Sequence, residues 1–258
     1  MTQVEQSLRL LNVFFTTNKI DFWLEAGTAL AAHRDGEIFS WEHDIDVAIW
    51  KESTLNLDDL IVFFENEGFD VVIQKSLPFL DNIIQLKVKD GYKDKLFDID
   101  IYLYTKKDNY AYMRWIQKPE GFFGRLKKEV LLLLRNIVNP QSYKWEKRSI
   151  LVNRFLAKKI FLNYLKWHIR NSSCIYHRFP IDIFSNLKQI DFYGLKVKIP
   201  SETDTFLTYR YGSSWKTPDS QFNETGKWKK SKARVQLPMS LLPIPQFNSK
   251  LLKNNRKP

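Results

Sequence analysis

The spacing of hydrophobic and polar positions predicts three helices in the first hundred residues. Apolar residues at helical spacing follow a Thr-x-x-Glu capping sequence at residues 2–5, so a helix is expected at the start of the chain. A second apolar stripe covers residues 57–68 and ends on a glycine, as many helices do. Between them, a Gly-Thr turn at residues 27–28 is expected to lead into a short helix over residues 29–34.

Five runs of branched and aromatic residues predict β-strands in the same region. They occupy residues 22–26, 44–50, 69–74, 83–88 and 96–104. The link between the last two contains an Asp-Gly pair, which predicts a hairpin. The pattern therefore indicates an α+β unit, a small mixed sheet with helices on one face.

The strand at residues 44–50 carries the first candidate chemistry. Asp44, Asp46 and a small residue alternate with branched apolar residues, and this period of two is typical of a strand with one buried face. The two carboxylates then lie on the same side, close enough to bind one divalent cation.

A second acidic strand follows, with the same alternation. Asp98 and Asp100 share one of its faces. Three or four carboxylates that converge on one sheet face raise each other's pKa unless a cation lies among them, and oxygen ligands suit Mg²⁺ or Mn²⁺. Asp44, Asp46 and Asp100 are the predicted metal ligands and catalytic residues, with Asp98 as the alternative third ligand.

The predicted turn before the first acidic strand adds a phosphate site. Backbone N–H groups at a helix N-terminus bind phosphate oxygens, and Gly27, followed by Thr28, would let a phosphate approach closely. Arg34, at the end of the same helix, either reaches a phosphate or is a helix C-terminal charge in solvent. His43 is expected to pack beside the site rather than bind the metal. A metal beside a phosphate cradle is the equipment for phosphoryl transfer and is characteristic of the polymerase β-like nucleotidyltransferase superfamily.

Composition and charge limit the other possibilities. The net charge of +11 favours polyanionic partners, and residues 125–178 contain thirteen Lys or Arg against two acids. This helical block is either a solvated face or a peripheral contact with anionic lipid headgroups. One cysteine excludes an intrachain disulfide. Because no signal-like or membrane-spanning apolar run is found, we expect a cytoplasmic protein, in peripheral contact with the inner membrane face if the block binds lipid.

The chain is expected to divide into four parts. They are a nucleotidyltransferase-like catalytic core at 1–110, a basic helical insertion at 111–175, an irregular C-terminal segment packed on the core at 176–238 and a flexible tail at 239–258.

Two stretches resemble the LicD/fukutin family. Residues 22–30 (Phe-Trp-Leu-Glu-Ala-Gly-Thr-Ala-Leu), Arg34, Trp41, Asp44-Ile45-Asp46 and the strand from Asp100 resemble its N-terminal motifs. Residues 194–200, 206–207 and the run Tyr-Gly-Ser-Ser-Trp-Lys-Thr-Pro at 211–218 resemble its C-terminal ending. His43 and Ser214 stand where the family commonly has acidic residues. The resemblance covers roughly residues 20–104 and 178–218.

The resemblance implies an activity. Such proteins transfer a phospho-alcohol (phosphocholine, ribitol phosphate or a relative) from a CDP-activated donor to a hydroxyl of a glycan or lipid-linked glycan, and CMP leaves. By position, Asp44, Asp46 and Asp100 would hold Mg²⁺ on the donor diphosphate, while Gly27, Thr28 and Arg34 would contact its phosphates. A nucleic-acid partner is not expected. The alternatives are a nucleotidyltransferase acting on a small molecule or RNA end, and a basic binding module with a decayed site. Residues 211–218 either pack against a sheet edge or contact substrate, and Lys196 and Lys198 are expected to be solvated strand residues.

Overall fold

The structure is a computed structural model that describes residues 1–53, 55–73, 83–115, 130, 159–160, 163–164, 166–167, 170–171, 173–218 and 231–242. The chain divides into two compact units, which are treated separately. The first contains Met1–Gln74, Asp81–Arg114 and Tyr176–Val235, and the second Lys75–Leu80, Trp115–Ile175 and Gln236–Pro258. Most of the expected basic helical block, and the expected flexible tail from residue 243 onward, lie outside the described residues. The four-part division stays a prediction.

The described helices and strands are, in chain order, α1 (Gln3–Thr17), β1 (Phe22–Leu24), α2 (Ala26–Arg34), β2 (Asp44–Trp50), α3 (Leu57–Asn66), β3 (Phe69–Ile73), β4 (Ile83–Val88), η1 (Asp90–Tyr92), β5 (Asp98–Lys107), β6 (Tyr110–Trp115), β7 (Ser173–Pro180), η2 (Ile181–Phe184), β8 (Leu187–Phe192), β9 (Leu195–Pro200), α7 (Thr203–Tyr211), β10 (Arg234–Pro238) and η4 (Met239–Leu241). The expected strands and the helices at α1 and α3 are confirmed within a few residues. Thr2 Oγ1 caps α1 by accepting from the backbone N–H of Glu5 at 3.1 Å.

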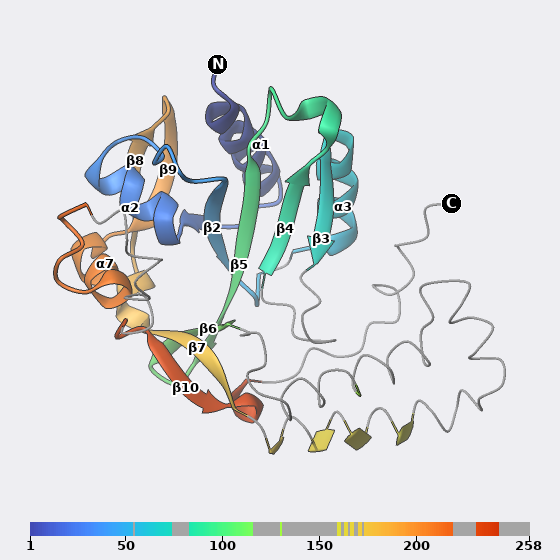
Figure 1. Cartoon of the computed structure of the whole chain (residues 1–258), viewed down its shortest axis with the longest axis vertical. Helices are drawn as coiled ribbons and strands as arrows, with labels where there is room; N and C mark the ends of the chain where they lie inside the picture. The colour runs from blue at the N-terminus through green and yellow to red at the C-terminus, as the bar shows by residue number, and fades with distance from the viewer. Residues whose placement is uncertain are drawn as a thin grey trace. The chain divides into compact units, whose positions relative to one another are not determined.

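A mixed sheet organises the first unit (Figure 1). Its centre is the parallel pair β2 and β5, with β1 antiparallel to β2 on one side. On the other side β4 runs antiparallel to β5, and β3 to β4. The link between β4 and β5 is the short turn η1, so the predicted hairpin is confirmed. Beyond Tyr104, β5 turns to a new partner and pairs with β6. The α+β class with a mixed sheet is therefore confirmed.

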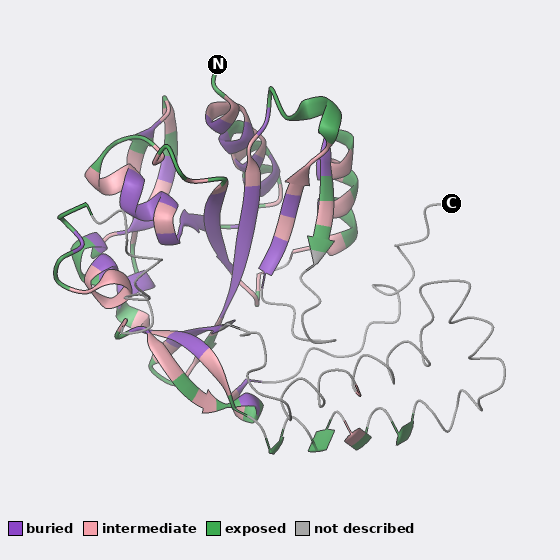
Figure 2. Ribbon diagram, in the orientation of Figure 1, coloured by how far each residue is buried: buried purple, intermediate pink, exposed green. Residues whose placement is uncertain are grey.

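Both faces of β2 are buried, which corrects the expectation of one buried face. Residues 45–49 are all buried, and β2 and β5 are purple along most of their length in Figure 2. One face packs against α1, where Phe15 lies 5.0 Å from Phe22 between ring centroids. The opposite face carries Trp23 and Tyr104, whose rings pack against Phe184 of η2. The C-terminal segment therefore covers this second face through η2.

Helix α2 begins earlier than its sequence indicated. It starts at Ala26, so Gly27 and Thr28 lie in its first turn rather than before it. Ala26 has φ +45°, a left-handed conformation that costs a non-glycine residue about 1 kcal/mol or more. The bonds of this turn to β2 hold it in place: Thr28 Oγ1 accepts from the N–H of Asp46 at 2.8 Å, and the N–H of Glu25 donates to the carbonyl of Asp46 at 3.0 Å.

The segment expected to be irregular is largely regular. It contains β7, the β8–β9 hairpin, α7 and β10. Pro180, Pro200 and Pro238 are the last residues of β7, β9 and β10. The β8–β9 turn places Tyr193 and Gly194 at φ +51° and +72°, the handedness that a tight hairpin needs.

Candidate active site

The register of the two central strands gathers the four candidate aspartates. In the parallel pair of β2 and β5, Asp44 lies opposite Asp98 and Asp46 opposite Asp100. Paired residues of neighbouring strands point to the same side, so the four carboxylates share one face of the sheet. Asp46 and Asp100 are each only 8% exposed. The structure thus brings together the residues that the sequence predicted as metal ligands.

The two aspartates of β5 differ in their neighbours. Asp98 Oδ1 accepts from the backbone N–H of Val88 at 2.8 Å, and its Oδ2 lies 3.0 Å from Lys87 Nζ. Asp100 accepts from Gln85 Nε2, which is 3.1 Å from both carboxylate oxygens. Both oxygens of Asp98 and both oxygens of Asp100 are therefore engaged with residues of β4, and the choice of Asp100 as the third ligand stays a prediction.

Burial and mutual repulsion make the charged forms of this cluster unfavourable. The pKa of Asp46 is raised well above its usual range, first by burial and then by the charge of Asp44, although Arg210 opposes the shift. Burial, followed by the negative charge of Asp98, likewise raises the pKa of Asp44 against the opposing charge of Lys87. The pKa of Asp100 is raised by burial and by the charge of Asp44. A bound cation would relieve this repulsion.

Whether these residues suit a metal can be judged from their chemistry and their geometry. The donor set is all oxygen, and its raised pKa values indicate a shortage of positive charge, so its chemistry fits Mg²⁺ or Mn²⁺. In the part of the chain that the structure describes, however, no three such side chains converge closely enough to hold an ion as they stand. The side chains of Gln85 and Lys87 occupy carboxylate oxygens instead. Metal binding would therefore require these side chains to rearrange.

Glu42 is a site residue that the sequence reading did not select. A Cβ built on Gly27 would meet Glu42 Oε1 at 2.6 Å and Asp46 Oδ2 at 3.7 Å, so both carboxylates lie against the first turn of α2. Burial, followed by the charge of Asp44, raises the pKa of Glu42. The period of two that placed Asp44 and Asp46 extends back to Glu42, and this signal was available in the sequence.

Three further residues around the carboxylates were also missed. Tyr102 is buried and donates its hydroxyl to Asp46. Gln85 and Lys87 lie two residues apart on β4, so their side chains share one face of the sheet. It is the face of the aspartates, because Gln85 is paired with Asp100 of β5. Their period of two was readable, but only the pairing of β4 with β5 reveals what they face.

Arg34 and His43, which the sequence placed near the site, make other contacts or face solvent. Arg34 donates to Asp35 and, at 2.9 Å, to the carbonyl of Trp215, and its guanidinium carbon lies 5.1 Å from the centre of the Phe39 ring. These bonds hold the Arg34 guanidinium in place, and its contact with a phosphate stays a prediction. His43 is exposed.

The segment with the Tyr-Gly-x-x-Trp pattern mainly packs against the rest of the unit. Trp215 is 7% exposed, and its indole N–H donates to Thr208 Oγ1 at 3.2 Å. Tyr211 is close enough to the acidic cluster for the charges of Asp46 and Glu42 to raise its pKa, after the larger effect of burial and against Arg210. This arrangement favours the packing interpretation for Trp215 and leaves Tyr211 as the member nearest the carboxylates.

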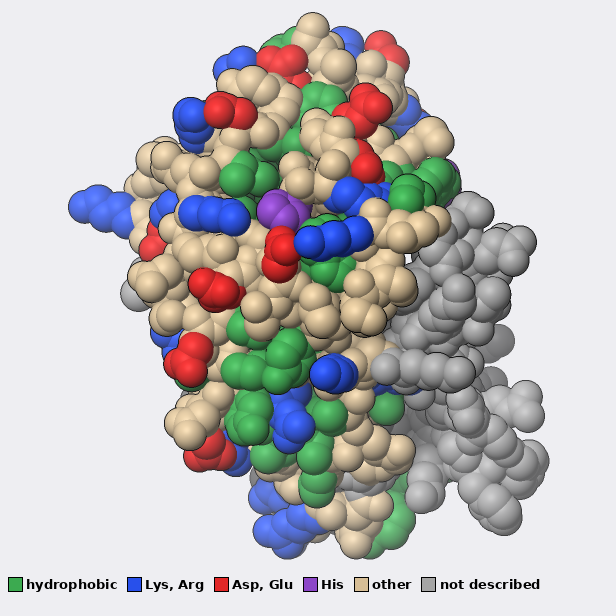
Figure 3. Space-filling view, turned by 90° about the vertical axis from the view of Figure 1, so that its left-hand side faces the viewer, with side chains coloured by type: hydrophobic (Ala, Val, Ile, Leu, Met, Phe, Trp, Pro, Cys, Tyr) green, Lys and Arg blue, Asp and Glu red, His purple; other side chains and the backbone are tan. Residues whose placement is uncertain are grey.

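Two lysines of strand β9 are in ion pairs. Lys196 Nζ lies 2.8 Å from Asp191, and Lys198 pairs with Asp21. On the face seen in Figure 3, acidic and basic side chains are interspersed in the same way, without a continuous basic field. This agrees with the expectation that Lys196 and Lys198 are surface strand residues.

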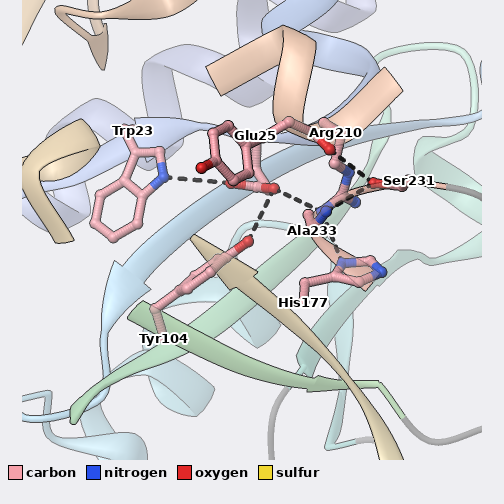
Figure 4. A network of polar contacts seen from close by, with 8 residues as sticks. Trp23, Glu25, Tyr104, His177, Arg210, Ser231 and Ala233 are labelled. Atoms are coloured by element: carbon pink, nitrogen blue, oxygen red, sulfur yellow. Dashed lines mark hydrogen bonds and ion pairs between the residues drawn. The ribbon is translucent and has the colours of Figure 1, made fainter. Parts of the chain in front are cut away.

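A buried ion pair lies beneath the site and joins α7 to the start of α2 (Figure 4). Arg210 Nη1 is 3.0 Å from Glu25 Oε1 and 2.7 Å from His177 Nδ1. Glu25 is fully buried and also accepts from the hydroxyl of Tyr104 at 3.1 Å and the indole of Trp23 at 3.3 Å. Burial raises the pKa of Glu25, while Arg210 and these donors oppose the shift. The network fixes the residue that precedes α2, and through its N–H the adjacent backbone of Asp46.

Comparison with known proteins now identifies this region. Residues 19–131 match the model of the LicD/FKTN/FKRP nucleotidyltransferase domain. This part of the chain is therefore similar to the LicD-type domain. The match includes the four aspartates, Gly27, Thr28 and Glu42, and its description places the LicD-type domain among transferases. It ends before residues 178–218, so the family resemblance of that segment stays a prediction.

Individual relatives of the LicD-type domain match over shorter stretches. An uncharacterized protein of Rickettsia typhi is 25% identical over 118 residues, which are 46% of this chain and 34% of that protein. An uncharacterized protein of Rickettsia prowazekii is 30% identical over 71 residues, 28% of this chain and 27% of the relative. The chain thus spans about a third or less of these relatives' lengths. The crystal structure of ANT(2")-Ia in complex with adenylyl-2"-tobramycin superposes with a TM-score of 0.30 at 14% identity, over 65% of this chain and 98% of that one.

Among the described residues, no helix is both long and apolar enough to cross a membrane.

Proposed function

We propose that this protein transfers a phospho-alcohol, such as phosphocholine or ribitol phosphate, from a CDP-linked donor to a glycan hydroxyl and releases CMP. The observation that carries the proposal is the register of β2 and β5, which sets four carboxylates on one face beside the first turn of α2. The similarity of residues 19–131 to the LicD-type domain supports this class of donor. The polymerase β-like fold assignment, the cytoplasmic location, the lipid-linked acceptor and the contact with anionic membrane belong to the same proposal.

The residues divide the work according to their positions. Asp44, Asp46 and Asp100 would hold Mg²⁺, which when bound neutralises negative charge on the donor diphosphate. The N–H groups of the first turn of α2, at Gly27 and Thr28, would contact the phosphates. Burial on the sheet face excludes water and strengthens these interactions.

The chemical step is a displacement at the phosphorus atom that bears the alcohol. The acceptor hydroxyl forms the new O–P bond, the bond to the CMP phosphate breaks, and CMP leaves as the anion. The hydroxyl proton passes to a carboxylate of the cluster. A carboxylate whose pKa is raised is a stronger base, and Glu42, which is not among the proposed metal ligands, meets this condition.

The test uses parallel donors. The purified protein is incubated with Mg²⁺, a lipid-linked or soluble glycan fraction, and either CDP-choline, CDP-ribitol or CTP. Release of CMP together with a phospho-alcohol on the glycan is expected with one of the CDP-linked donors and is lost in Asp46→Asn. Pyrophosphate from CTP, with CMP attached to the acceptor, would instead support the nucleotidyltransferase alternative. The Lys196→Met protein is the control, because Lys196 lies on the β8–β9 hairpin and pairs with Asp191.

A further inference from the structure

Lys87 is placed where a cation is needed. Its Nζ lies 3.0 Å from Asp98 Oδ2 and 3.9 Å from Asp100 Oδ1. The side chain is 39% exposed, which leaves it accessible to a ligand.

Strand β4 presents two different donors to the acidic strand. Gln85, opposite Asp100, supplies a neutral amide, and Lys87, two residues on, supplies a positive charge. In this arrangement the lysine balances part of the charge of the cluster. A divalent cation bound by Asp100 would lie near the Lys87 ammonium, and the cation and the ammonium would repel each other. The four-carbon stem of a lysine lets its ammonium move to another anion.

We propose that Lys87 is a phosphate-binding residue of this site. Its ammonium pairs with Asp98 and Asp100 when no divalent cation is bound, and with the diphosphate of the donor when one is. This inference rests on the proposed function, since it takes the diphosphate from the donor named there. It makes Lys87 a competitor of the metal and a partner of the phosphates, so one substitution should change the two affinities in opposite directions.

The first measurement is the binding of Mn²⁺ alone at low ionic strength, by isothermal titration calorimetry. Lys87→Met removes the charge and keeps most of the stem, and we expect it to bind Mn²⁺ about fivefold more tightly, the effect of losing one partly screened charge. Lys87→Arg keeps the charge and should retain the wild-type affinity. Lys196→Met, which breaks a comparable exposed Lys–Asp pair away from the cluster, should also match the wild type.

The second measurement is the binding of CDP with Mn²⁺ near saturation. Lys87→Met should bind CDP about tenfold more weakly, as expected for loss of one charged contact with a phosphate. Lys87→Arg should retain most of the affinity. Tighter Mn²⁺ binding together with weaker CDP binding supports the proposal, because a purely structural lysine would not tighten the binding of the metal.

The other outcomes overturn it. Unchanged Mn²⁺ affinity in Lys87→Met would show that the lysine does not compete with the metal, and unchanged CDP affinity would remove the phosphate contact. If the wild type binds no Mn²⁺, the inference and the metal assignment of the proposed function both fail. If the wild type binds Mn²⁺ and releases CMP while Lys87→Met behaves as Lys196→Met, only the inference about Lys87 fails.

Discussion

The buried pair of Glu25 and Arg210 allows a quantitative prediction of stability. Substituting Arg210→Met keeps most of the side-chain volume and removes the positive charge. Glu25 is fully buried and Arg210 is 10% exposed, so solvent cannot replace the lost partner. Breaking a buried pair by removing one member costs about 3–5 kcal/mol, because an uncompensated charge remains in the interior.

Two features of the structure adjust this magnitude. Glu25 keeps hydrogen bonds from Tyr104 and Trp23 in the variant, and these still stabilise its charged form. Its raised pKa means that it can also take up a proton, which lowers the cost. We therefore expect the lower end of the range, about 3 kcal/mol at neutral pH. Arg210→Met also leaves His177 without its arginine contact at 2.7 Å.

Equilibrium unfolding in urea, followed by tryptophan fluorescence and circular dichroism, measures the effect. The matched control is Arg9→Met, which breaks the exposed pair with Glu5 on α1 and should cost no more than about 0.5 kcal/mol. The double variant Glu25→Gln with Arg210→Met should recover part of the loss, since it leaves no buried charge. A loss below about 1 kcal/mol for Arg210→Met, or no recovery in the double variant, would refute the assignment of a buried ion pair.

Three further predictions concern the site and its supports. Burial, and then the charges of Arg210 and Arg234, hold the pKa of His177 well below its ordinary value of 6.5, so the unfolded chain binds the proton more readily than the folded chain does. The free energy of unfolding should therefore fall as the pH drops below about 6.5, by at most about 1.4 kcal/mol per pH unit. In urea titrations, the His177→Asn protein should lose less stability over this acidic range than the wild type. Gly27→Ala should lower the affinity for CDP, because the new Cβ would lie 2.6 Å from Glu42 Oε1 and displace that side chain. Its free energy of unfolding should change by less than about 1 kcal/mol, because the gain in helix propensity offsets the strain. An unchanged affinity for CDP would contradict the placement of Glu42. Asp46→Asn should abolish transfer yet raise the metal-free unfolding free energy by roughly 1 kcal/mol, since it removes a repelled buried charge; a destabilised variant on urea titration would argue against that repulsion.

Much of the fold followed from local pattern. A period of two in consecutive residues determines which side chains share a strand face, so Asp44 and Asp46, and separately Asp98 and Asp100, could be paired from the sequence. Capping residues and glycines likewise marked α1 and α3 closely. The start of α2 was misplaced because its first turn is held by bonds to Asp46, eighteen residues from Thr28, and no local signal reports them.

What the sequence by itself determined, then, is the chemistry of each strand face and the similarity of residues 19–131 to the LicD-type domain. The tertiary structure decided which faces meet. The parallel register of β2 and β5 set the two acidic pairs side by side, and the pairing of β4 with β5 brought Gln85 and Lys87 to them. The ion pair of Arg210 with Glu25 joins residues 185 positions apart. Strand order and register depend on the packing of the whole sheet, so neighbouring residues along the chain encode them only weakly.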